Sequence, residues 1–577
     1  MPKVSEYIAD VLAVEQVPAV FELVGGMITH MLDAIHLRGV TPIISMRHEQ
    51  GAAFAAEGCS RLAGRPAVAM ATSGPGATNL LTGVASCYFD STPSVFITGQ
   101  VNTNEQKGEL NVRQLGFQET DIVSMASAVT KKAWRIEHED QIVQVFQDAF
   151  KLAVNGRPGP VLIDIPMNVQ RAQIIEHAIA VNNESRLSIS NPIDTDALIA
   201  SLLKAKKPLI LAGGGIRSGN AAQLFRSFAE LANVPVVHSL MGVDILPYDH
   251  PLNKGMIGSY GNRWANLSLA ECDWLLVLGS RLDVRQTGGN TEAFKGQREI
   301  YHIDCEPAEM NNRIKGCKTI VSEIAPALAS LIEAFNIISA DLAVRFSAWL
   351  SYIDALRLRW PDISELDSSI GINPNIFMHE LSRHFSRVSA YVTDVGQHQM
   401  WAAQSLELHS GERFLTSGGM GSMGFGLPAA IGAAIAQREH PTVLIAGDGG
   451  FQCNIQELET VANLQLPIKI VIINNQCHGM VRQFQESYFE SRFQSTVWGY
   501  SAPDFARVAE AYQIPARTID DPKEVMSGAD WLASQSRGPS LLQVMVPQSH
   551  NAYPKLAFGH ALDSMEPFVK PLDMEST

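Results

Sequence analysis

Short apolar runs alternate with stretches of helical periodicity along most of the chain. In residues 1–170, five such runs end at glycine, proline or polar residues, and the segments between them carry apolar residues three and four positions apart. This alternation predicts a parallel sheet covered by helices on both faces. The predicted strands are AVFELVGG, TPIISMR, RPAVAMATSG, PSVFITGQ and GPVLIDIP.

The same pattern occurs twice more. We therefore predict an α/β fold of three doubly wound parallel-sheet domains, at residues 1–170, 191–336 and 373–550. Residues 171–190 lose periodicity and are predicted as a linker, and residues 337–372 as a helical connector. Residues 551–577 are predicted as a tail that either caps the site or is partly disordered. The further predicted strands are KPLILAGGG, NVPVVHSL, DWLLVLGS and REIYHID in the second domain, and SAYVTDVG, VLIAG and IKIVII in the third.

In one predicted strand–helix–strand unit, a polar residue follows each of the two strands. The first strand is followed by Asp448 and the second by Asn475, with a predicted helix between them whose expected N-cap is Asn454. A right-handed crossover places both carboxyl ends at one edge of the sheet. Asp448 and Asn475, which are 27 positions apart in the sequence, are therefore expected to lie close together. Carboxylate and amide oxygens suit Mg²⁺ or Ca²⁺, and the glycines beside Asp448 suit a phosphate.

Composition narrows the possible partners. The 577 residues carry a net charge of −15 without a basic stripe, which argues against nucleic acid or an anionic membrane as a partner. Seven scattered cysteines lack paired metal-ligand spacing and favour a reducing cytoplasm. The N-terminal segment lacks the apolar core of a signal peptide, and no apolar run approaches 18 residues, so a cytoplasmic protein is expected.

Several motifs resemble one known family. GDG, a spacer and NN resemble the diphosphate and Mg²⁺ motif of thiamine diphosphate enzymes, and residues 443–480 as a whole resemble acetolactate synthase. The resemblance covers roughly residues 1–550 and implies thiamine diphosphate, Mg²⁺ and a homo-oligomer, dimer or tetramer, with sites between subunits. The other matching segments are HEQGAAFAAEG (48–58), TSGPGATNLLTG (72–83), GFQETDIV (116–123), VGQHQMWAAQ (395–404) and SGGMGSMGFGLPAAIGAAIAQ (417–437).

The resemblance also implies roles for individual residues. Glu49 would hydrogen-bond the aminopyrimidine ring of the cofactor and promote the tautomer that takes the thiazolium proton, whereas from the residues alone a carboxylate at a helix start equally suits the helix dipole. Met423 would support the bent cofactor, although a core methionine usually only fills space. The expected catalytic residues are Glu49, Gln118 and Gly26; the expected thiamine diphosphate contacts are Glu49, Thr72, Asn79, Gln397, His398, Gly421, Ser422, Met423, Gly449, Gly450, Gly479 and Met480; and the expected metal ligands are Asp448, Asn475 and the Cys477 carbonyl.

The second domain is similar to the domain with which acetolactate synthases hold FAD. The three glycines after its first strand could cradle a phosphate, although such a run is more often a tight turn. The resemblance places two arginines at phosphates or flavin and an aspartate near the adenosine end. The expected FAD contacts are Gly213, Gly214, Gly215, Ser239, Leu240, Gly258, Arg281, Asp283, Arg285 and Asp304.

Three departures from the family fall on the acceptor side. A longer segment, VNTNEQKGELNVRQLG, stands before FQET where the family has a short VPRR-type segment. Met167 replaces a lysine, and Phe484 replaces the tryptophan that favours 2-oxobutyrate as acceptor. Changes of methylene size shift acceptor preference by about 10–200-fold. The expected substrate contacts are Phe117, Gln118, Met167 and Phe484.

These observations predict a carboligase that decarboxylates pyruvate and transfers the two-carbon unit to a carbonyl acceptor. A nucleotide-linked keto sugar as acceptor is an alternative, which the longer 102–116 segment could accommodate. A cyclic diketone hydrolase is another. A non-enzymatic paralogue is disfavoured, because it has no chemical need for Glu49 or the Asp448 and Asn475 pair.

Overall fold

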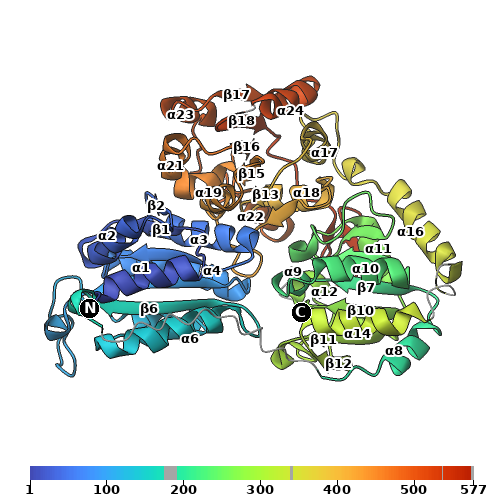
Figure 1. The fold of residues 1–577 in the computed structure, drawn as a ribbon. Coiled ribbons are helices and arrows are strands. Elements are labelled where there is room, and N and C mark those ends of the chain that lie inside the picture. Colours follow the sequence, from blue (N-terminus) through green and yellow to red (C-terminus); the bar gives the residue numbers. More distant parts are fainter. Residues whose placement is uncertain (175–190, 338–341, 343, 536, 574–577) are drawn as a thin grey trace.

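The chain forms three lobes (Figure 1). The computed structural model describes residues 1–174, 191–337, 342, 344–535 and 537–573, so most of the predicted linker and a short part of the predicted connector lie outside the described residues. In Figure 1 the C-terminal domain lies on top, the N-terminal domain at the lower left and the central domain at the lower right. No helix in the described ranges is long and apolar enough to cross a membrane.

The N-terminal sheet has six parallel strands in the order β2-β1-β3-β4-β6-β5. Strands β3, β4 and β6 are buried along their whole length because helices cover both faces. The strands are β1 Val20–Leu23, β2 Ile43–Ser45, β3 Ala67–Ala71, β4 Ser94–Gln100, β5 Lys132–Arg135 and β6 Pro160–Pro166; the helices are α1 Val4–Val14, α2 Thr29–Arg38, α3 Glu49–Ala63, α4 Pro75–Phe89, α5 Ile122–Ala126, α6 Ile142–Val154 and α7 Met167–Arg171.

The central sheet is also parallel, but its order is β9-β8-β7-β10-β11-β12. The chain starts in the middle at β7, moves to one edge and returns to continue from β10 on the other side. Its strands are β7 Pro208–Ala212, β8 Val236–His238, β9 Asn253–Met256, β10 Trp274–Leu278, β11 Glu299–Asp304 and β12 Lys318–Val321; the helices are α8 Thr195–Leu202, α9 Gly215–Ser218, α10 Ala222–Ala232, α11 Arg263–Glu271, α12 Val284–Thr287, α13 Thr291–Lys295 and α14 Ile324–Asn336, with α16 Ser347–Arg359 following.

The C-terminal sheet repeats the order of the N-terminal one, as β14-β13-β15-β16-β18-β17. The predicted α/β fold of three parallel-sheet domains is therefore confirmed. The strands are β13 Ala390–Thr393, β14 Arg413–Leu415, β15 Thr442–Gly447, β16 Ile468–Asn474, β17 Ala516–Ile519 and β18 Ser540–Met545; the helices are α17 Pro374–His384, α18 Gln397–Ser405, α19 Gly426–Ala436, α20 Asp448–Phe451, the 3-10 helix η8 Gln452–Glu457, α21 Leu458–Asn463, α22 Gly479–Tyr488, α23 Phe505–Ala511 and α24 Val525–Ser534.

One inner strand, β18, is absent from the prediction, and five further strands that the apolar pattern does not predict lie at sheet edges. They are β5, β9, β12, β14 and β17, and each has only three or four residues. An edge strand that short lacks the continuous apolar run that marks a buried strand, so its pattern resembles that of a loop.

The predicted N-cap at Asn454 is wrong. The helical segment already begins at Asp448, and Asn454 interrupts it with φ −133°. Its amide instead donates to the Gly424 carbonyl at 2.8 Å and to Oε1 of Gln50 at 3.1 Å. Asn454 therefore connects the segment after Asp448 to a glycine-rich loop and to the N-terminal domain.

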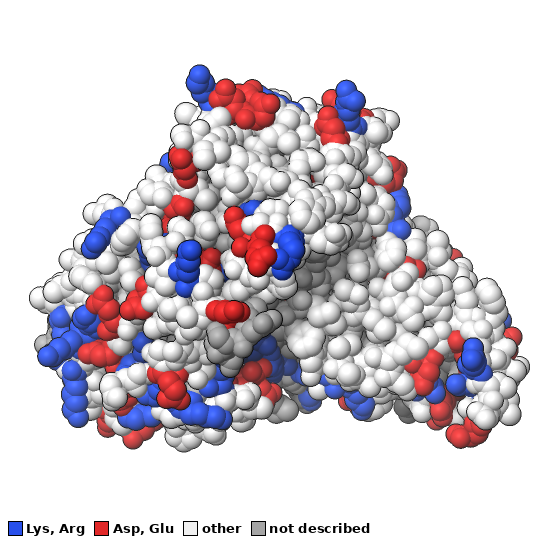
Figure 2. Space-filling model, turned by 180° about the vertical axis from the view of Figure 1, so that it is seen from behind, with Lys and Arg blue, Asp and Glu red and all other residues white. Residues whose placement is uncertain are grey.

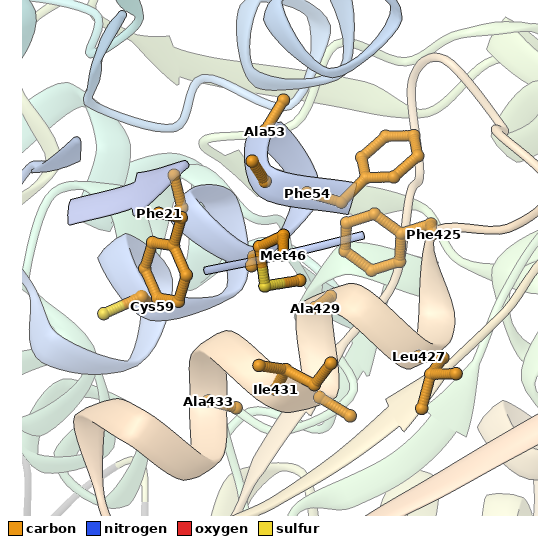
Figure 3. Close-up of a cluster of buried hydrophobic side chains, with 14 of the residues drawn as sticks. Phe21, Met46, Ala53, Phe54, Cys59, Phe425, Leu427, Ala429, Ile431 and Ala433 are labelled. Atoms are coloured by element: carbon orange, nitrogen blue, oxygen red, sulfur yellow. The ribbon is translucent and has the colours of Figure 1, made fainter. Parts of the chain in front are cut away.

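Helices α3 and α19 join the N-terminal and C-terminal domains at backbone distance. A Cβ atom on Gly58 would overlap the Ala429 carbonyl oxygen, and one on Gly432 would overlap the Ala55 carbonyl oxygen. Phe54 and Phe425 meet edge to face at 5.5 Å beside this crossing (Figure 3). The small residues along both helices thus give the two domains one continuous apolar core.

The described tail, residues 551–573, begins on the C-terminal domain and then packs on the central domain. Its strands β19 Lys555–Leu556 and β20 Met565–Glu566 pair antiparallel. Leu556, Leu562 and Met565 enter the apolar core of that domain, and the Leu556 nitrogen donates to the Ser259 carbonyl at 2.8 Å. These contacts order the segment beyond the last strand of the C-terminal sheet.

Candidate cofactor and metal site

Three oxygen atoms converge where strands β15 and β16 end. The side-chain oxygen of Asn475 lies 3.3 Å from Oδ1 of Asp448 and 2.9 Å from the carbonyl oxygen of Cys477, and all three residues are buried. Oxygens this close repel one another unless a cation lies between them. Carboxylate, amide and carbonyl oxygens are the donors that Mg²⁺ and Ca²⁺ prefer, so these residues fit a hard cation.

The surroundings of Asp448 agree with a cation site. Burial raises the pKa of its carboxyl to about 6, although the Tyr500 hydroxyl donates to Oδ2 at 3.0 Å. A cation would offset this cost of burying the charge. Within the described residues, no three His, Cys, Asp or Glu side chains gather as a softer metal would require.

The imidazole of His398 lies beside this edge with one nitrogen unpaired. His398 is at the start of α18, and a Cβ atom on Gly447 would come within 2.8 Å of its Nδ1. Its Nε2 is buried and has no hydrogen-bond partner among the described residues. Burial lowers the pKa of the ring to about 3, so the imidazole is neutral. A buried, unpaired ring nitrogen fits contact with a ligand group such as a phosphate oxygen.

Glycines let the loops around the three oxygens approach one another. A Cβ atom on Gly450 would overlap Oδ1 of Asp394, and one on Gly479 would overlap Oε1 of Gln397. On Gly449 it would lie 2.6 Å from the His478 ring. Side chains at these positions would separate the loops, so the glycines form a cradle at the carboxyl edge of the sheet.

Two buried carboxylates hold the glycine-rich loop at residues 418–426. Asp90 accepts from the backbone nitrogens of Gly418 at 2.9 Å and Gly419 at 2.6 Å. Asp394 accepts from those of Gly424 at 3.1 Å and Gly426 at 2.8 Å. Between the two clamps the loop presents the predicted contacts Gly421 and Ser422, both half-buried, and Met423, which is 40% exposed.

A second group of predicted residues gathers at the carboxyl edge of the N-terminal sheet. Glu49, the first residue of α3, is buried and accepts from Nδ2 of Asn79 at 2.9 Å. Thr72 accepts at 3.4 Å from the backbone nitrogen of Met27, the residue after Gly26. Gln118 lies against Gly74, where an added Cβ would come within 2.9 Å of its Cβ. In this half of the site the Glu49 carboxyl lies against Gly76, where an added Cβ would come within 3.3 Å of Oε1.

The two groups remain on separate sheets. Among the described residues, no hydrogen bond joins a predicted residue of the N-terminal group to one of the C-terminal group. The links between the domains run beside them, from Glu457 to the backbone nitrogens of Arg47 at 2.9 Å and His48 at 3.1 Å.

Two of the four predicted substrate contacts are exposed, and Gln118 and Met167 are half-buried. Phe117 is 81% exposed and Phe484 is 37% exposed. Met167 begins α7 and is half-buried. Next to it, the Asn168 side chain accepts from the Thr103 nitrogen at 2.9 Å, which fixes the base of the 102–116 loop. Phe484 contacts Tyr488 at 4.9 Å and Phe489 at 5.7 Å, measured between ring centroids.

A cavity of about 480 Å³ lies among all three domains and brings most of the predicted FAD contacts together. It opens where the central sheet reverses its order, between β7 and β10, which is where such sheets bind dinucleotides. Gly213 and Gly258 do not line it; an added Cβ would overlap Gly279 at the first and lie 2.5 Å from the Arg285 carbonyl oxygen at the second. The predicted residues that line it are Gly214, Gly215, Ser239, Leu240, Arg281, Asp283, Arg285 and Asp304.

Sequence reasoning missed several residues of these sites. Tyr500, which donates to Asp448, lies in a segment with no recognisable motif. The outer domains also contribute residues to the wall of the central cavity, namely Arg61, Asp90, Arg157 and Arg413. No spacing in the chain indicates these contacts, because they depend on how the domains pack.

Comparisons with known proteins agree with this geometry. Residues 2–125 match the domain family described as thiamine pyrophosphate enzyme, N-terminal TPP binding domain, residues 195–331 the central domain, and residues 394–544 the C-terminal TPP binding domain. Thiamine pyrophosphate is another name for thiamine diphosphate.

Full-length relatives extend the match. The acetolactate synthase large subunit of Lactococcus lactis is 36% identical over 558 residues, which cover 95% of this chain and 93% of the relative. The acetolactate synthase isozyme 2 large subunit of Escherichia coli is 35% identical over 563 residues, covering 97% and 98%. A probable acetolactate synthase large subunit of Methanococcus aeolicus is 36% identical over 538 residues, covering 90% and 88%. The chain therefore belongs to the thiamine pyrophosphate enzymes, within the family of acetolactate synthase large subunits.

Proposed function

We propose that this protein is a thiamine diphosphate-dependent carboligase that decarboxylates pyruvate and transfers the two-carbon unit to a carbonyl acceptor. The observation that carries the proposal is the convergence of the Asp448, Asn475 and Cys477 oxygens beside the unpaired nitrogen of His398. Membership of the acetolactate synthase family supports it. A complete set of oxygen donors also argues against a non-enzymatic paralogue.

Mg²⁺ would be held by Asp448, Asn475 and the Cys477 carbonyl. His398, Gln397 and the glycines at residues 449, 450 and 479 surround the place next to it and would hold the diphosphate. A divalent cation held by these residues would offset negative charge that is costly to bury.

Glu49 would hold the aminopyrimidine ring. When bound, thiamine diphosphate supplies the nucleophilic carbon and the electron sink for decarboxylation. Asn79 donates to Oε2 of Glu49 and so fixes the carboxyl, leaving Oε1 to hold a proton at the ring nitrogen. The apolar side chain of Met423 would support the cofactor between the two halves of the site.

The central cavity would take FAD. Its place at the sheet reversal suits a dinucleotide, and Arg281 and Arg285 in its wall suit phosphate groups. The glycines that follow β7 and β10 lie backbone to backbone, since an added Cβ on Gly215 would come within 2.6 Å of Gly279 Cα. This close approach leaves room for a ligand at the strand ends.

The protein would act as a homo-oligomer, dimer or tetramer, with sites between subunits. The Glu49 group and the Asp448 group lie on separate sheets of one chain, and no hydrogen bond among the described residues joins them, so a partner subunit could complete each half. Seen from behind, the N-terminal lobe at the right carries few charged side chains above its lower edge (Figure 2). Such depletion of charge is typical of the centre of a subunit interface.

Two carbonyl compounds are candidates for the acceptor. Pyruvate as acceptor would give 2-acetolactate. A nucleotide-linked keto sugar is the second candidate, favoured by the exposed 102–116 loop, which Glu119 closes by accepting from the nitrogens of Lys107 at 2.6 Å and Leu115 at 2.7 Å. A loop fixed in this way can form one wall of a wider pocket.

One experiment tests the donor half and separates the acceptors. Purified protein is incubated with pyruvate, Mg²⁺ and thiamine diphosphate, and CO₂ and acetolactate are followed. Acetolactate in step with CO₂ supports pyruvate as acceptor, and CO₂ release that rises with a keto sugar but yields little acetolactate supports the second candidate. Absence of pyruvate turnover with every acceptor would remove the proposal.

A further inference from the structure

A chain of side-chain amides connects the tail to the metal site. Gln483 of α22 is buried and pairs with the backbone of Ala552, accepting from its nitrogen at 3.0 Å and donating to its carbonyl oxygen at 3.1 Å. Gln397 donates to Oε1 of Gln483 at 3.2 Å. Asn475 in turn donates to Oε1 of Gln397 at 3.0 Å. We call Ala552, Gln483, Gln397 and Asn475 the amide relay.

The backbone of Ala552 determines the orientation of every side-chain amide in the relay. A backbone N–H can only donate and a carbonyl can only accept, so Ala552 fixes which end of the Gln483 amide is oxygen. The amide of Gln397 lies 3.2 Å from that oxygen, where a second oxygen would be repelled, so Gln397 must turn its nitrogen toward Gln483 and its oxygen away. The oxygen of Gln397 then requires the nitrogen of Asn475.

The last step sets the chemistry of the metal site. With its nitrogen committed to Gln397, Asn475 presents oxygen to Asp448 and Cys477, although the opposite orientation would give it hydrogen bonds at 3.3 and 2.9 Å. That orientation would place the Asn475 oxygen against the Gln397 oxygen. Turning Gln397 as well would only move the oxygen-to-oxygen contact to Gln483, which Ala552 prevents from turning.

We propose that Gln483 is a positioning residue that fixes the oxygen of Asn475 toward the metal, so that docking of the tail at Ala552 and binding of Mg²⁺ stabilise each other. This inference rests on the proposed function, since it takes Asn475 as a Mg²⁺ ligand. Gln483 touches neither the metal nor its other ligands and acts through Gln397.

The tail end of the relay is anchored independently. Asn551 donates to Oε2 of Glu486 at 2.8 Å and accepts from Arg482, both on α22. The Tyr553 carbonyl accepts from Nε2 of Gln404 of α18 at 3.1 Å. The backbone of Ala552 is therefore held on both sides and can impose its direction on Gln483.

The test replaces Gln483 by methionine, which has a similar length and no amide. The matched control is Gln485→Met on the same helix, because Gln485 bonds to Gln494 and Thr496 and lies outside the relay. Binding of Mg²⁺ in the presence of thiamine diphosphate is measured by calorimetry. Cleavage of the tail by a protease is followed with and without Mg²⁺. We expect Q483M to raise the Kd of Mg²⁺ about 10–100-fold, as loss of support around a metal ligand does.

Wild type and Q485M should bind Mg²⁺ alike, and Mg²⁺ should slow cleavage of their tails but not of the Q483M tail. Gln483→Glu is a second variant, which keeps an acceptor for Ala552 and Gln397 but sets an oxygen against the Ala552 carbonyl; it too should lose Mg²⁺ protection of the tail. An unchanged Kd in Q483M, with circular dichroism like that of wild type, would overturn the relay. Failure of the wild type to bind Mg²⁺ would instead overturn the proposed function.

Discussion

The carboxylate of Asp90 lies 2.9 Å from the backbone nitrogen of Gly418 and so connects the end of α4 to the glycine-rich loop of another domain. Asp90 also lines the central cavity, and the loop forms part of the same wall. One buried side chain thus borders the FAD candidate cavity and holds the loop that presents Met423.

Replacing Asp90 by asparagine should loosen this loop. An amide can accept from only one of the two glycine nitrogens and sets its own NH₂ against the other, so about 1–3 kcal/mol of stabilisation is lost. We expect the Kd of thiamine diphosphate to rise about tenfold or more, measured by fluorescence titration. Asp140→Asn, on the exposed η4 segment (Glu139–Gln141), is the control and should bind like the wild type. An unchanged Kd in D90N would show that the loop does not depend on this clamp.

Glu49→Gln should abolish most turnover while the cofactor still binds. Glutamine keeps the hydrogen-bonding length but cannot hold the proton at the ring, and such a group contributes about 10²–10⁴-fold to rate. Pyruvate consumption and cofactor binding are measured on the same preparation. Asn79→Ala should give a smaller loss, because it frees the Glu49 carboxyl without removing it. Wild-type rates in the glutamine variant would exclude the assigned role.

Phe484→Trp should shift the acceptor preference toward 2-oxobutyrate. The substitution restores the residue that acetolactate synthases carry, and shape contacts of this kind alter preference by about 10–200-fold. The ratio of the two products is measured with pyruvate and 2-oxobutyrate in competition. Trp498→Phe, at another exposed aromatic residue, serves as the control. A ratio that stays constant in F484W would place the acceptor elsewhere.

Gly58→Ala should destabilise the protein by about 1–3 kcal/mol or more, because its methyl group would overlap the backbone of α19. The free energy of unfolding is measured by denaturant titration. Gly289→Ala is the matched control, since an added Cβ there meets only the Phe558 ring at 4.0 Å. Equal stability of the two variants would mean that α3 and α19 can separate at little cost.

Stability should depend on pH through His379. Its ring bonds to Asp362 at 2.9 Å and Glu407 at 2.8 Å, and Arg383 also binds Glu407. Burial lowers the pKa of this imidazole, but the two carboxylates outweigh it and raise the pKa above its ordinary value of 6.5. The stabilising contribution is therefore complete below pH 6.5 and is lost as the pH rises through the folded-state pKa.

The comparison that checks this is Tm from pH 6 to 9 for wild type and His379→Gln. The difference between them should be largest at the acid end and shrink as the pH rises. His36→Gln, at an exposed histidine of α2, should follow the wild type. A difference that is constant with pH would contradict the assigned protonation.

The sequence predicts the parts of the molecule that local pattern controls. Buried strands such as β15 and β16 are continuous apolar runs, and a right-handed crossover brings Asp448 and Asn475 to one edge, where they lie 3.3 Å apart. Short edge strands such as β5 leave no such pattern.

Contacts between distant segments are likewise not predicted from the sequence. Asp90 and Gly418 lie in different domains, and Gln483 and Ala552 are 69 positions apart, so both contacts depend on tertiary packing. The helix predicted to begin after Asn454 also starts elsewhere, because the chain is already helical from Asp448. The Asn454 amide donates to the Gly424 carbonyl instead of capping a helix.

The identical strand order of the two outer sheets has a consequence for ancestry. Both follow one winding, whereas the central sheet follows another. The shared winding points to duplication of one ancestral domain, and the different winding of the central sheet points to a separate origin for the domain between them. The fold would then not require the present order of the outer domains along the chain. A permuted protein with the outer domains exchanged could form the same carboxyl edges of the two outer sheets.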